Sequence, residues 1–380
     1  MKKIMILTSE GGGGHTTATK AITHLLHNEY EINTVHVFKE VLLHLDIFKK
    51  ITFNRYSGEE LYNHLLQKNY YRLISFLFYY CAIWCIQLRK KQILTLLHAY
   101  LIHNQPDLII SVIPSINDSV LTIAQELSIP FMLMPTDLDI SIYLRGITKV
   151  THKNFYLCLP FNDQHIITAA VKALVPNNQI LITGPLIQEN FFTKKNITEL
   201  KKEHNLTNNK PTIMVLMGAK GSNGTEKYIF QLTQIQQPIN LIVCIGSHAK
   251  SRHSLKKLSI PAHITLTIID FTDRIADYMA LADIIITKSG SLSVCEGITM
   301  NTPLLLDATS TVLPWEKFNH HFITIHQFGD IITKYNDITP RVSSLLNNQD
   351  LLQNYKNNLI SFNQKNEQTQ LKKIIANVIT

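Results

Sequence analysis

Two short glycine-bearing turns constrain the fold of this chain more than any other feature. Ser9–His15 reads Ser-Glu-Gly-Gly-Gly-Gly-His after the apolar run Lys3–Thr8, and Lys288–Ser291 reads Lys-Ser-Gly-Ser after Ile284–Thr287. Each turn opens a predicted helix, whose N-terminus presents backbone N–H groups and the positive end of the helix dipole. Such a turn suits an anionic ligand. We therefore predict that the two turns form two walls of one donor–acceptor cleft.

The rest of the chain alternates apolar strands with amphipathic helical runs, which is typical of parallel sheets covered on both faces. We predict an α/β fold of two doubly wound Rossmann-like domains facing across the cleft, residues 1–185 and 186–380, with a polar connection near 193–210 after Gly184-Pro185. The tail beyond Thr339 predicts surface helices, and the return of one to the first domain is left open. Strands are expected at Lys3–Thr8, Ile32–Phe38, Asp107–Ile113, Pro130–Pro135, Gln179–Thr183, Thr212–Met217, Ile239–Ile245, Ile264–Ile269, Ile284–Thr287 and Pro303–Leu306.

The composition restricts the partners. A formal charge of +8 and a hydrophobic content of 45% indicate a folded protein that favours anionic partners. No Lys/Arg stripe is interleaved with stacking aromatic residues, so a nucleic acid is not expected. The five cysteines lack CxxC spacing and predict buried thiols in the cytosol, with no metal site or disulfide framework.

An insert at about 41–102 interrupts the first domain. Residues 73–88 carry no charge, and Arg72 and Arg89-Lys90-Lys91 flank them. The run is short for a bilayer span, which needs about 20 apolar residues. Its aromatic residues and flanking cations favour docking on an anionic membrane surface, through Tyr79, Trp84, Arg89, Lys90 and Lys91. A buried core helix is the main alternative.

Candidate functional residues follow the predicted strands. His15, at a helix start, would stay neutral and could act as a general base, while Gly12, Gly13 and Gly14 let a ligand approach the backbone. Asp137 lies where open α/β sheets bind ligands and could orient or deprotonate an acceptor. Both residues also fit plain structural roles, a flexible turn and a helix cap.

The second domain offers donor-side candidates. Ser289, Gly290 and Ser291 present N–H donors, and Glu296 could accept hydrogen bonds from a ribose diol or simply be a solvated helix residue. A second loop, Met217–Gly224, could close over a diphosphate with Gly218, Lys220 and Gly221, or be an ordinary turn. Glu316 and Asn319 lie one helical turn apart and could reach sugar hydroxyls together, or merely begin a helix.

Several motifs together resemble one enzyme group. They are GGGGHTTATKAI (Gly11–Ile22), LMGAKGSNG (Leu216–Gly224), IVCIGSHAK (Ile242–Lys250) and ADIIITKSGSLSVCEG (Ala282–Gly297), with weaker support from TDLD (Thr136–Asp139) and TGPLI (Thr183–Ile187). Over roughly residues 1–330 the chain is similar to the GT-B glycosyltransferases of the monogalactosyldiacylglycerol synthase and processive diacylglycerol glucosyltransferase group, which are related to MurG.

This resemblance implies an inverting, metal-independent UDP-sugar hexosyltransferase that needs no cofactor and works as a peripheral protein at the inner face of the cell membrane. The diphosphate would bind at Ser289–Ser291, the ribose at Glu296, the uracil at Ile245, Gly246 and Phe271, and the hexose at Glu316 and Asn319. The acceptor, a diacylglycerol-type lipid, would bind the first domain, with His15 or Asp137 as base.

The chain departs from the family where Trp315 replaces a common glutamine, where Ser289 and Ser291 replace proline and glycine or alanine, and where Ala219-Lys220 replaces a glycine. Three alternatives therefore stay open: a MurG-like N-acetylglucosamine transferase acting on a polyprenyl-linked acceptor, a nucleotide-sugar epimerase, and a catalytically silent lipid- or nucleotide-binding module.

Overall fold

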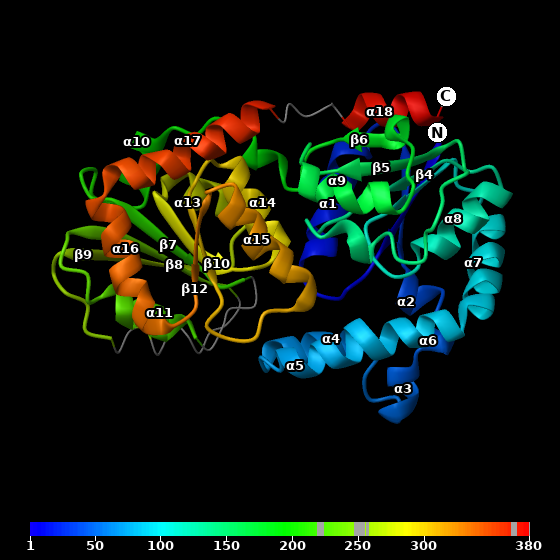
Figure 1. The fold of residues 1–380 in the computed structure, drawn as a ribbon, viewed down its shortest axis with the longest axis horizontal. Coiled ribbons are helices and arrows are strands. Elements are labelled where there is room, and N and C mark those ends of the chain that lie inside the picture. The colour runs from blue at the N-terminus through cyan, green and yellow to red at the C-terminus, as the bar shows by residue number, and fades with distance from the viewer. Residues whose placement is uncertain (219–223, 247–254, 256–257, 366–370, 380) are drawn as a thin grey trace. The chain divides into compact units, whose positions relative to one another are not determined.

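The structure is a computed structural model that describes residues 1–218, 224–246, 255, 258–365 and 371–379. The chain divides into two compact units, whose helices and strands are labelled in Figure 1. Unit 1 comprises 1–188, 313–315 and 366–380, and unit 2 comprises 189–312 and 316–365. Each unit contains one parallel six-stranded sheet with helices packed on it. The predicted α/β class with two Rossmann-like units is thus confirmed.

The sheet of unit 1 has the order β2-β1-β3-β4-β5-β6. Its strands are β1 (Lys3–Thr8), β2 (Glu31–His36), β3 (Leu108–Ser111), β4 (Phe131–Leu133), β5 (Phe155–Leu159) and β6 (Ile180–Ile182). The central strand β3 is buried throughout, which explains why it reads as a continuous apolar run. The strand order reverses direction between β1 and β3, and open α/β sheets bind ligands beyond the carboxyl ends of strands at such a switch point.

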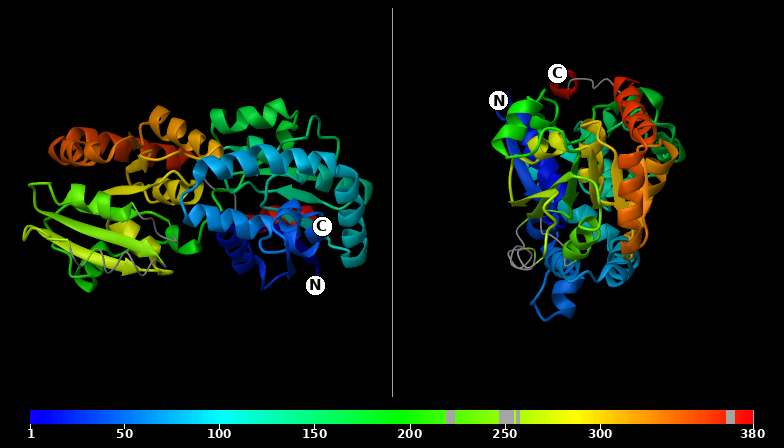
Figure 2. Two further views of the ribbon diagram at one scale, coloured as in Figure 1. Left: turned by 90° about the horizontal axis from the view of Figure 1, so that it is seen from below. Right: turned by 90° about the vertical axis from the view of Figure 1, so that its left-hand side faces the viewer.

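Helices cover this sheet, and an insert of short helices follows β2. The covering helices are α1 (Gly14–Leu26), α7 (Lys90–Asn104), α8 (Asn117–Glu126), α9 (Gln164–Lys172) and the C-terminal α18 (Leu371–Ile379). The insert contains α2 (Val37–Glu40), α3 (Ile47–Ile51), α4 (Gly58–Gln67), α5 (Tyr71–Ile74), the π-helix η2 (Ser75–Cys81) and α6 (Ala82–Leu88). Figure 2 shows α4–α6 together on one side of unit 1. One tail helix does return to the first unit, because Ile375 of α18 is fully buried there.

The sheet of unit 2 has the order β12-β11-β10-β7-β8-β9. Its strands are β7 (Thr212–Leu216), β8 (Ile239–Gly246), β9 (Ile264–Asp270), β10 (Ile284–Lys288), β11 (Leu304–Asp307) and β12 (Gly329–Ile332). Numbered within the unit and read from the other edge, this is the order 3-2-1-4-5-6 of dinucleotide-binding folds, whose switch point lies between β7 and β10.

Helices pack on the sheet of unit 2, of which α10 begins at a capping Asn196 side chain and α14 begins after Gly290. They are α10 (Ile197–Glu203), α11 (Thr225–Leu232), α13 (Ile275–Leu281), α14 (Ser291–Thr299), α15 (Lys317–Ile325), α16 (Ile338–Asn347) and α17 (Gln349–Lys365). Helix α14 follows β10 after two residues and packs closely on β11. A Cβ placed on Gly297 would lie 2.6 Å from Leu304 Cδ2, so glycine permits this contact.

The polar connection predicted near 193–210 stays a prediction, and this stretch contains helix α10, whose N-terminus the Asn196 side chain caps by accepting from the Glu199 N–H. Two other expectations from sequence are wrong in detail. The strand expected at Ile32–Phe38 ends at His36, where α2 begins. The buried-core alternative for residues 73–88 is also wrong: within Tyr71–Leu88 only Tyr71 and Ile74 are buried. That helix is long and apolar enough to cross a membrane by length and composition alone.

Candidate functional site

The glycine turn of unit 1 is held by helix α4 of the insert. Glu59 accepts hydrogen bonds from Ser9 Oγ at 2.6 Å and from the Glu10 N–H at 2.9 Å, and Asn63 Oδ1 accepts from the Gly12 N–H at 3.0 Å. The Gly11 N–H donates to Ser9 Oγ at 3.1 Å. Gly12 has φ +77°, which glycine adopts without strain.

This clamp changes the expectation for the turn. Three of its N–H groups already donate to protein oxygens, and the Glu59 carboxylate lies where an anion would bind. A phosphate there would be repelled. The anion-binding interpretation is therefore disfavoured for Gly12, whereas for Gly13 and Gly14 it stays a prediction, as does the role of all three glycines in acceptor binding.

His15, the second residue of α1, has one ring nitrogen fixed by the backbone. Its Nδ1 lies 2.8 Å from the Val112 carbonyl oxygen, just beyond β3, and 3.1 Å from Thr136 Oγ1. A carbonyl oxygen only accepts, so Nδ1 carries the proton and Nε2 is the basic nitrogen. Burial lowers the pKa of His15, while the charge of Asp137 opposes this by raising it. The imidazole is thus neutral near pH 7, as a general base must be.

Asp137 lies in the same part of unit 1, beyond β4. Its Oδ2 accepts from the hydroxyl of Tyr143 at 2.7 Å, and that hydroxyl is 2.8 Å from Thr136 Oγ1. Tyr143 is fully buried, and burial together with Asp137 holds its pKa well above the usual value, so it stays a donor. Sequence reasoning brought His15 and Asp137 together correctly in one region, but it missed Tyr143 and Thr136, which position them.

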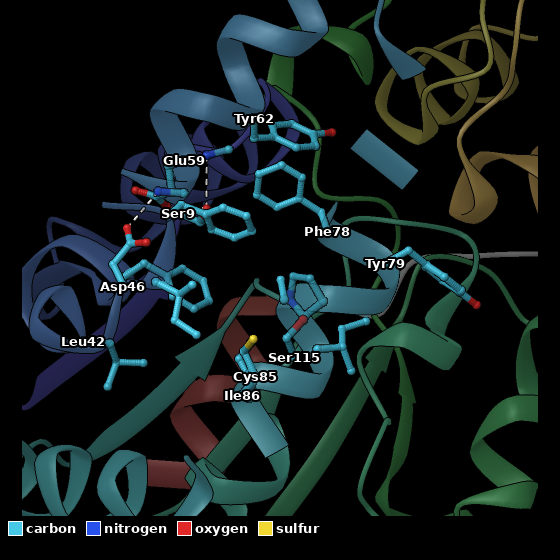
Figure 3. A pocket seen from close by; sticks show the side chains of 18 of the residues that line it. Ser9, Leu42, Asp46, Glu59, Tyr62, Phe78, Tyr79, Cys85, Ile86 and Ser115 are labelled. Atoms are coloured by element: carbon cyan, nitrogen blue, oxygen red, sulfur yellow. Dashed lines mark hydrogen bonds between the residues drawn. The ribbon is translucent and has the colours of Figure 1, made fainter. Parts of the chain in front are cut away.

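Both candidates line an apolar cavity of about 270 Å³ (Figure 3). One wall comes from the loops that follow the strands of unit 1, with Ser9, His15, Ser115 and Asp137. The other wall comes mainly from the insert and includes Leu42, Phe48, Phe78, Ala82 and Ile86. In Figure 3 the aromatic rings of Tyr62 and Phe78 lie beside each other above the cavity. Their ring centroids are 5.2 Å apart in an edge-on arrangement.

Trp315 also belongs to this wall. Its ring stacks on that of Tyr79 with centroids 6.3 Å apart. The guanidinium of Arg145 lies over the same Tyr79 ring, 5.0 Å from its centroid. Nearby, Leu313 is buried against Leu65 and Ile74 of the insert. Where related enzymes commonly carry glutamine, this chain therefore has a ring that completes an apolar cavity.

In unit 2 the turn after β10 is fixed from beneath by Asn319 of α15. The Asn319 amide donates to the Ser289 carbonyl oxygen at 2.6 Å and to Ser291 Oγ at 3.0 Å, and this side chain has no exposed surface. Ser289 Oγ contacts His320 Nε2 and lies 3.1 Å from the Asp307 carbonyl oxygen. The turn is thus preorganised at the start of α14, at the switch point of the sheet. The burial of Asn319 fits a positioning role, and its predicted contact with a sugar stays a prediction.

Glu316 lies near the same turn, and Glu296 lies further along α14. A Cβ placed on Gly290 would lie 3.8 Å from Glu316 Oε1, so this carboxylate borders the turn. Glu296, on α14, is only 6% exposed, and burial raises its pKa to about 8. The alternative that Glu296 is simply a solvated helix residue is wrong for this reason. Its role at a ribose, and its meeting with His15 across one cleft, stay predictions.

The remaining donor-side candidates lie at carboxyl ends of strands of unit 2. Gly218 follows β7 with φ +83° and has open space around it. Ile245 is buried, Gly246 ends β8 with φ +58°, and Phe271 follows β9 with 69% of its surface exposed. Lys220 and Gly221 lie outside the described residues.

The five predicted membrane-docking residues separate into two groups. Trp84 is 62% exposed and Lys91 is exposed. The others are engaged within unit 1: Tyr79 with Trp315, Arg89 through a hydrogen bond to the Leu45 carbonyl oxygen, and Lys90 through an ion pair with Asp118 at 2.6 Å. The exposed apolar residues that share the helix with Trp84 are Leu73, Phe76, Tyr80 and Leu88.

Known proteins provide the next comparison. Residues 212–378 match the glycosyltransferase family 28 C-terminal domain. The processive diacylglycerol beta-glucosyltransferase of Staphylococcus haemolyticus is 26% identical over 365 residues, covering 94% of this chain and 88% of the relative. That of Bacillus subtilis is 24% identical, covering 94% and 90%. The crystal structure of Acinetobacter baumannii MurG matches with a TM-score of 0.63 at 14% identity, covering 100% of this chain and 99% of that one.

These matches confirm the resemblance predicted from the motifs. The fold is GT-B-like, and the chain is a glycosyltransferase. The region that matches the family 28 domain begins at β7 and so includes the turn at Ser289–Ser291, with its switch-point geometry.

Proposed function

We propose that this protein transfers a hexose from a UDP-sugar to the hydroxyl of a diacylglycerol-type lipid at a membrane surface, with inversion at the anomeric carbon. The observation that carries this proposal is the neutral His15, which lines an apolar cavity and whose Nδ1 is bound to the Val112 carbonyl oxygen, so that Nε2 is the basic nitrogen. A neutral base that lines an apolar cavity suits an acceptor that carries a hydroxyl on an apolar molecule. The names of the relatives, diacylglycerol beta-glucosyltransferases, support the same acceptor.

Donor binding is assigned to unit 2. The preorganised turn Ser289–Ser291 opens helix α14, which has nine residues and no acidic residue in its first turn. Its dipole would stabilise a diphosphate there. Support for a uridine nucleotide comes from likeness in fold to a UDP complex of S. aureus MnaA, with a TM-score of 0.54 at 13% identity.

The chemistry can be followed through the side chains of this chain. His15 Nε2 takes the proton of the acceptor hydroxyl as its oxygen attacks the anomeric carbon. The bond from that carbon to the diphosphate oxygen breaks, and UDP leaves with the bonding electrons toward the N-terminus of α14. Asp137, whose charge raises the pKa of His15, would stabilise the imidazolium as it forms. We propose that no metal ion takes part, and chelation by EDTA should then leave the rate unchanged.

Membrane docking is assigned to the outer face of the helix from Tyr71 to Leu88. Its exposed apolar residues Phe76, Tyr80, Trp84 and Leu88 recur every four residues, so they share one side of the helix. An exposed apolar stripe of this kind beside cations marks a membrane or partner surface. Because this docking would occur at the cytosolic leaflet, we propose a peripheral location at the inner face of the cell membrane.

The direct test is incubation with UDP-glucose and other UDP-sugars, diacylglycerol and a polyprenyl-linked acceptor, followed by mass analysis of the lipids. A hexosyl-diacylglycerol product supports the proposal. A product on the polyprenyl acceptor with N-acetylglucosamine would replace it with the MurG-like alternative. UDP binding without transfer to any lipid would leave a silent binding module.

A further inference from the structure

We infer that the cavity of unit 1 encloses the first part of one acyl chain of the acceptor lipid, so that the insert selects the acceptor by chain as well as by hydroxyl. This inference rests on the proposed function and goes further, because it assigns a protein-walled chain site distinct from the exposed stripe that contacts the bilayer. Without it, the lipid would present only its glycerol end to the enzyme.

The polarity of the cavity wall points to such an occupant. The charged groups that border it are largely engaged by the wall itself. Asp46 accepts from the Gly58 N–H at 2.7 Å, Arg89 donates to the Leu45 carbonyl oxygen at 2.8 Å, and Glu59 binds Ser9. Figure 3 shows Asp46 and Ser9 on one side of the cavity, with Cys85 and Ile86 on another. Apart from His15, the cavity is therefore lined mostly by aliphatic and aromatic side chains.

The cavity size limits the occupant to one chain. Its volume of about 270 Å³ is roughly twice that of the ~150 Å³ apolar cavity that binds a benzene molecule. This accommodates a short length of one alkyl chain and not two long chains side by side. The second chain would then remain in the bilayer, against which the exposed face of the same helix is proposed to dock.

The insert is built to present this wall. The π-helix Ser75–Cys81 contributes Phe78 and Tyr79 to the cavity, while Phe76 before this pair and Tyr80 after it are exposed. One helix thus carries two apolar faces, an inner one on the cavity and an outer one on solvent. Phe78 is fixed by stacking on Phe48 with centroids 5.0 Å apart. A lipid lifted from a membrane at the outer face would have to travel only the thickness of this helix.

The two tryptophans of the chain make the inference testable, because they lie on different surfaces. Trp315 lines the cavity and Trp84 is on the exposed stripe. In the Trp84→Phe variant only Trp315 fluoresces, and in Trp315→Phe only Trp84 does. Dioctanoylglycerol brominated on its acyl chains, below its micelle concentration and without donor, should quench Trp315 saturably and leave Trp84 nearly unchanged. Equal quenching of both, or none of Trp315, would overturn the inference.

Variants of α6 provide an independent measurement. Ala82→Phe places a ring in the cavity, whereas Gln87→Phe adds the same ring to an exposed position of the same helix. With Ala82→Phe we expect the KM for dioctanoylglycerol to rise about tenfold or more and that for dibutyrylglycerol to change little, at an unaltered KM for the UDP-sugar. Gln87→Phe should match wild type for both lipids. Equal effects of Ala82→Phe on both chain lengths would contradict a chain site.

The outcomes separate this inference from the proposed function. Saturable quenching of Trp315 without transfer to any lipid would keep the chain site and remove the function. Transfer to diacylglycerol with no dependence on chain length and no quenching of Trp315 would keep the function and remove the chain site.

Discussion

The imidazole Nδ1 of His15 lies 2.8 Å from the carbonyl oxygen of Val112, so a residue at the start of α1 is oriented by the end of a neighbouring strand. Strands β1 and β3 pair directly, which brings these distant segments together. The hydrogen bond selects the tautomer, and burial keeps the ring neutral. The basic nitrogen is therefore defined by the fold before any substrate binds.

The pH profile should report this residue. Burial lowers the pKa of His15 from its ordinary value of 6.5, so kcat/KM should stay level as the pH falls to 6.5 and decline only below it. The Asp137 charge raises that pKa, so Asp137→Asn should move the decline to still lower pH. His15→Ala should lower kcat by about 100-fold or more. Turnover within about threefold of wild type in both variants would show that neither residue is the base.

Loss of the α4 clamp should reduce activity without unfolding the protein. Asn63→Ala removes the acceptor of the Gly12 N–H and the donor to the Glu10 carbonyl oxygen, which leaves the turn before His15 poorly held. We expect kcat to fall about tenfold with little change in the KM of the donor, because a misplaced catalytic group weakens the transition state. Gln67→Ala, at an exposed position of the same helix, is the control. Equal activity of both variants, measured by steady-state kinetics, would argue against the clamp.

Asn319→Asp should weaken donor binding. The variant keeps the shape of the side chain but loses the amide that donates to the Ser289 carbonyl oxygen and to Ser291 Oγ, and it buries a carboxylate beside the turn. We expect the Kd for UDP, measured by calorimetry, to rise about tenfold or more. Asn357→Asp on α17, at an exposed position, is the matched control. An unchanged Kd in Asn319→Asp would remove this turn from the donor site.

Stability should depend on pH through Glu296. Burial raises its pKa to about 8 from an ordinary value of 4.5, so the folded state keeps a proton that the unfolded chain releases. The contribution of this carboxyl group to the free energy of unfolding is fully present below pH 4.5, and it is lost as the pH rises through about 8. Glu296→Gln should therefore gain stability relative to wild type over this range, measured by urea unfolding. A constant difference between the two proteins at all pH values would show that the carboxyl is ionised as in water.

Vesicle binding should depend on the outer stripe and less on the two engaged cations. Trp84→Ser should weaken binding to anionic vesicles in a sedimentation assay, because it removes a large exposed ring. Lys91→Gln should weaken it further at low salt, whereas Val171→Ser, on α9 and also exposed, should have no effect. Substituting Lys90 would break its pair with Asp118, so it is a poor probe of the membrane. Indifference of binding to Trp84 and Lys91 would exclude docking through this helix.

The sequence predicted the long apolar strands and the helices that follow them, because fully buried parallel strands read as uninterrupted apolar runs. It did not predict β5 (Phe155–Leu159), although this strand is also an apolar run, or the edge strand β12 (Gly329–Ile332), which pairs with β11. His15 and Asp137 follow strands and could be found by position. Glu59 and Asn63 lie on an insert whose packing no local pattern records, so their contacts with the glycine turn could not be anticipated.

The small segment Leu313–Trp315 has a consequence for how this protein can be divided. It lies in sequence between β11 and α15 of unit 2, yet its side chains complete the apolar interior of unit 1, as does helix α18 near the other end of the chain. A gene cut after residue 188 would therefore yield a first fragment lacking part of its own interior and a second fragment with Leu313 and Trp315 uncovered. The two halves should be poorly soluble when produced separately. They should recover solubility when co-expressed, because the second fragment then supplies the segments that complete unit 1.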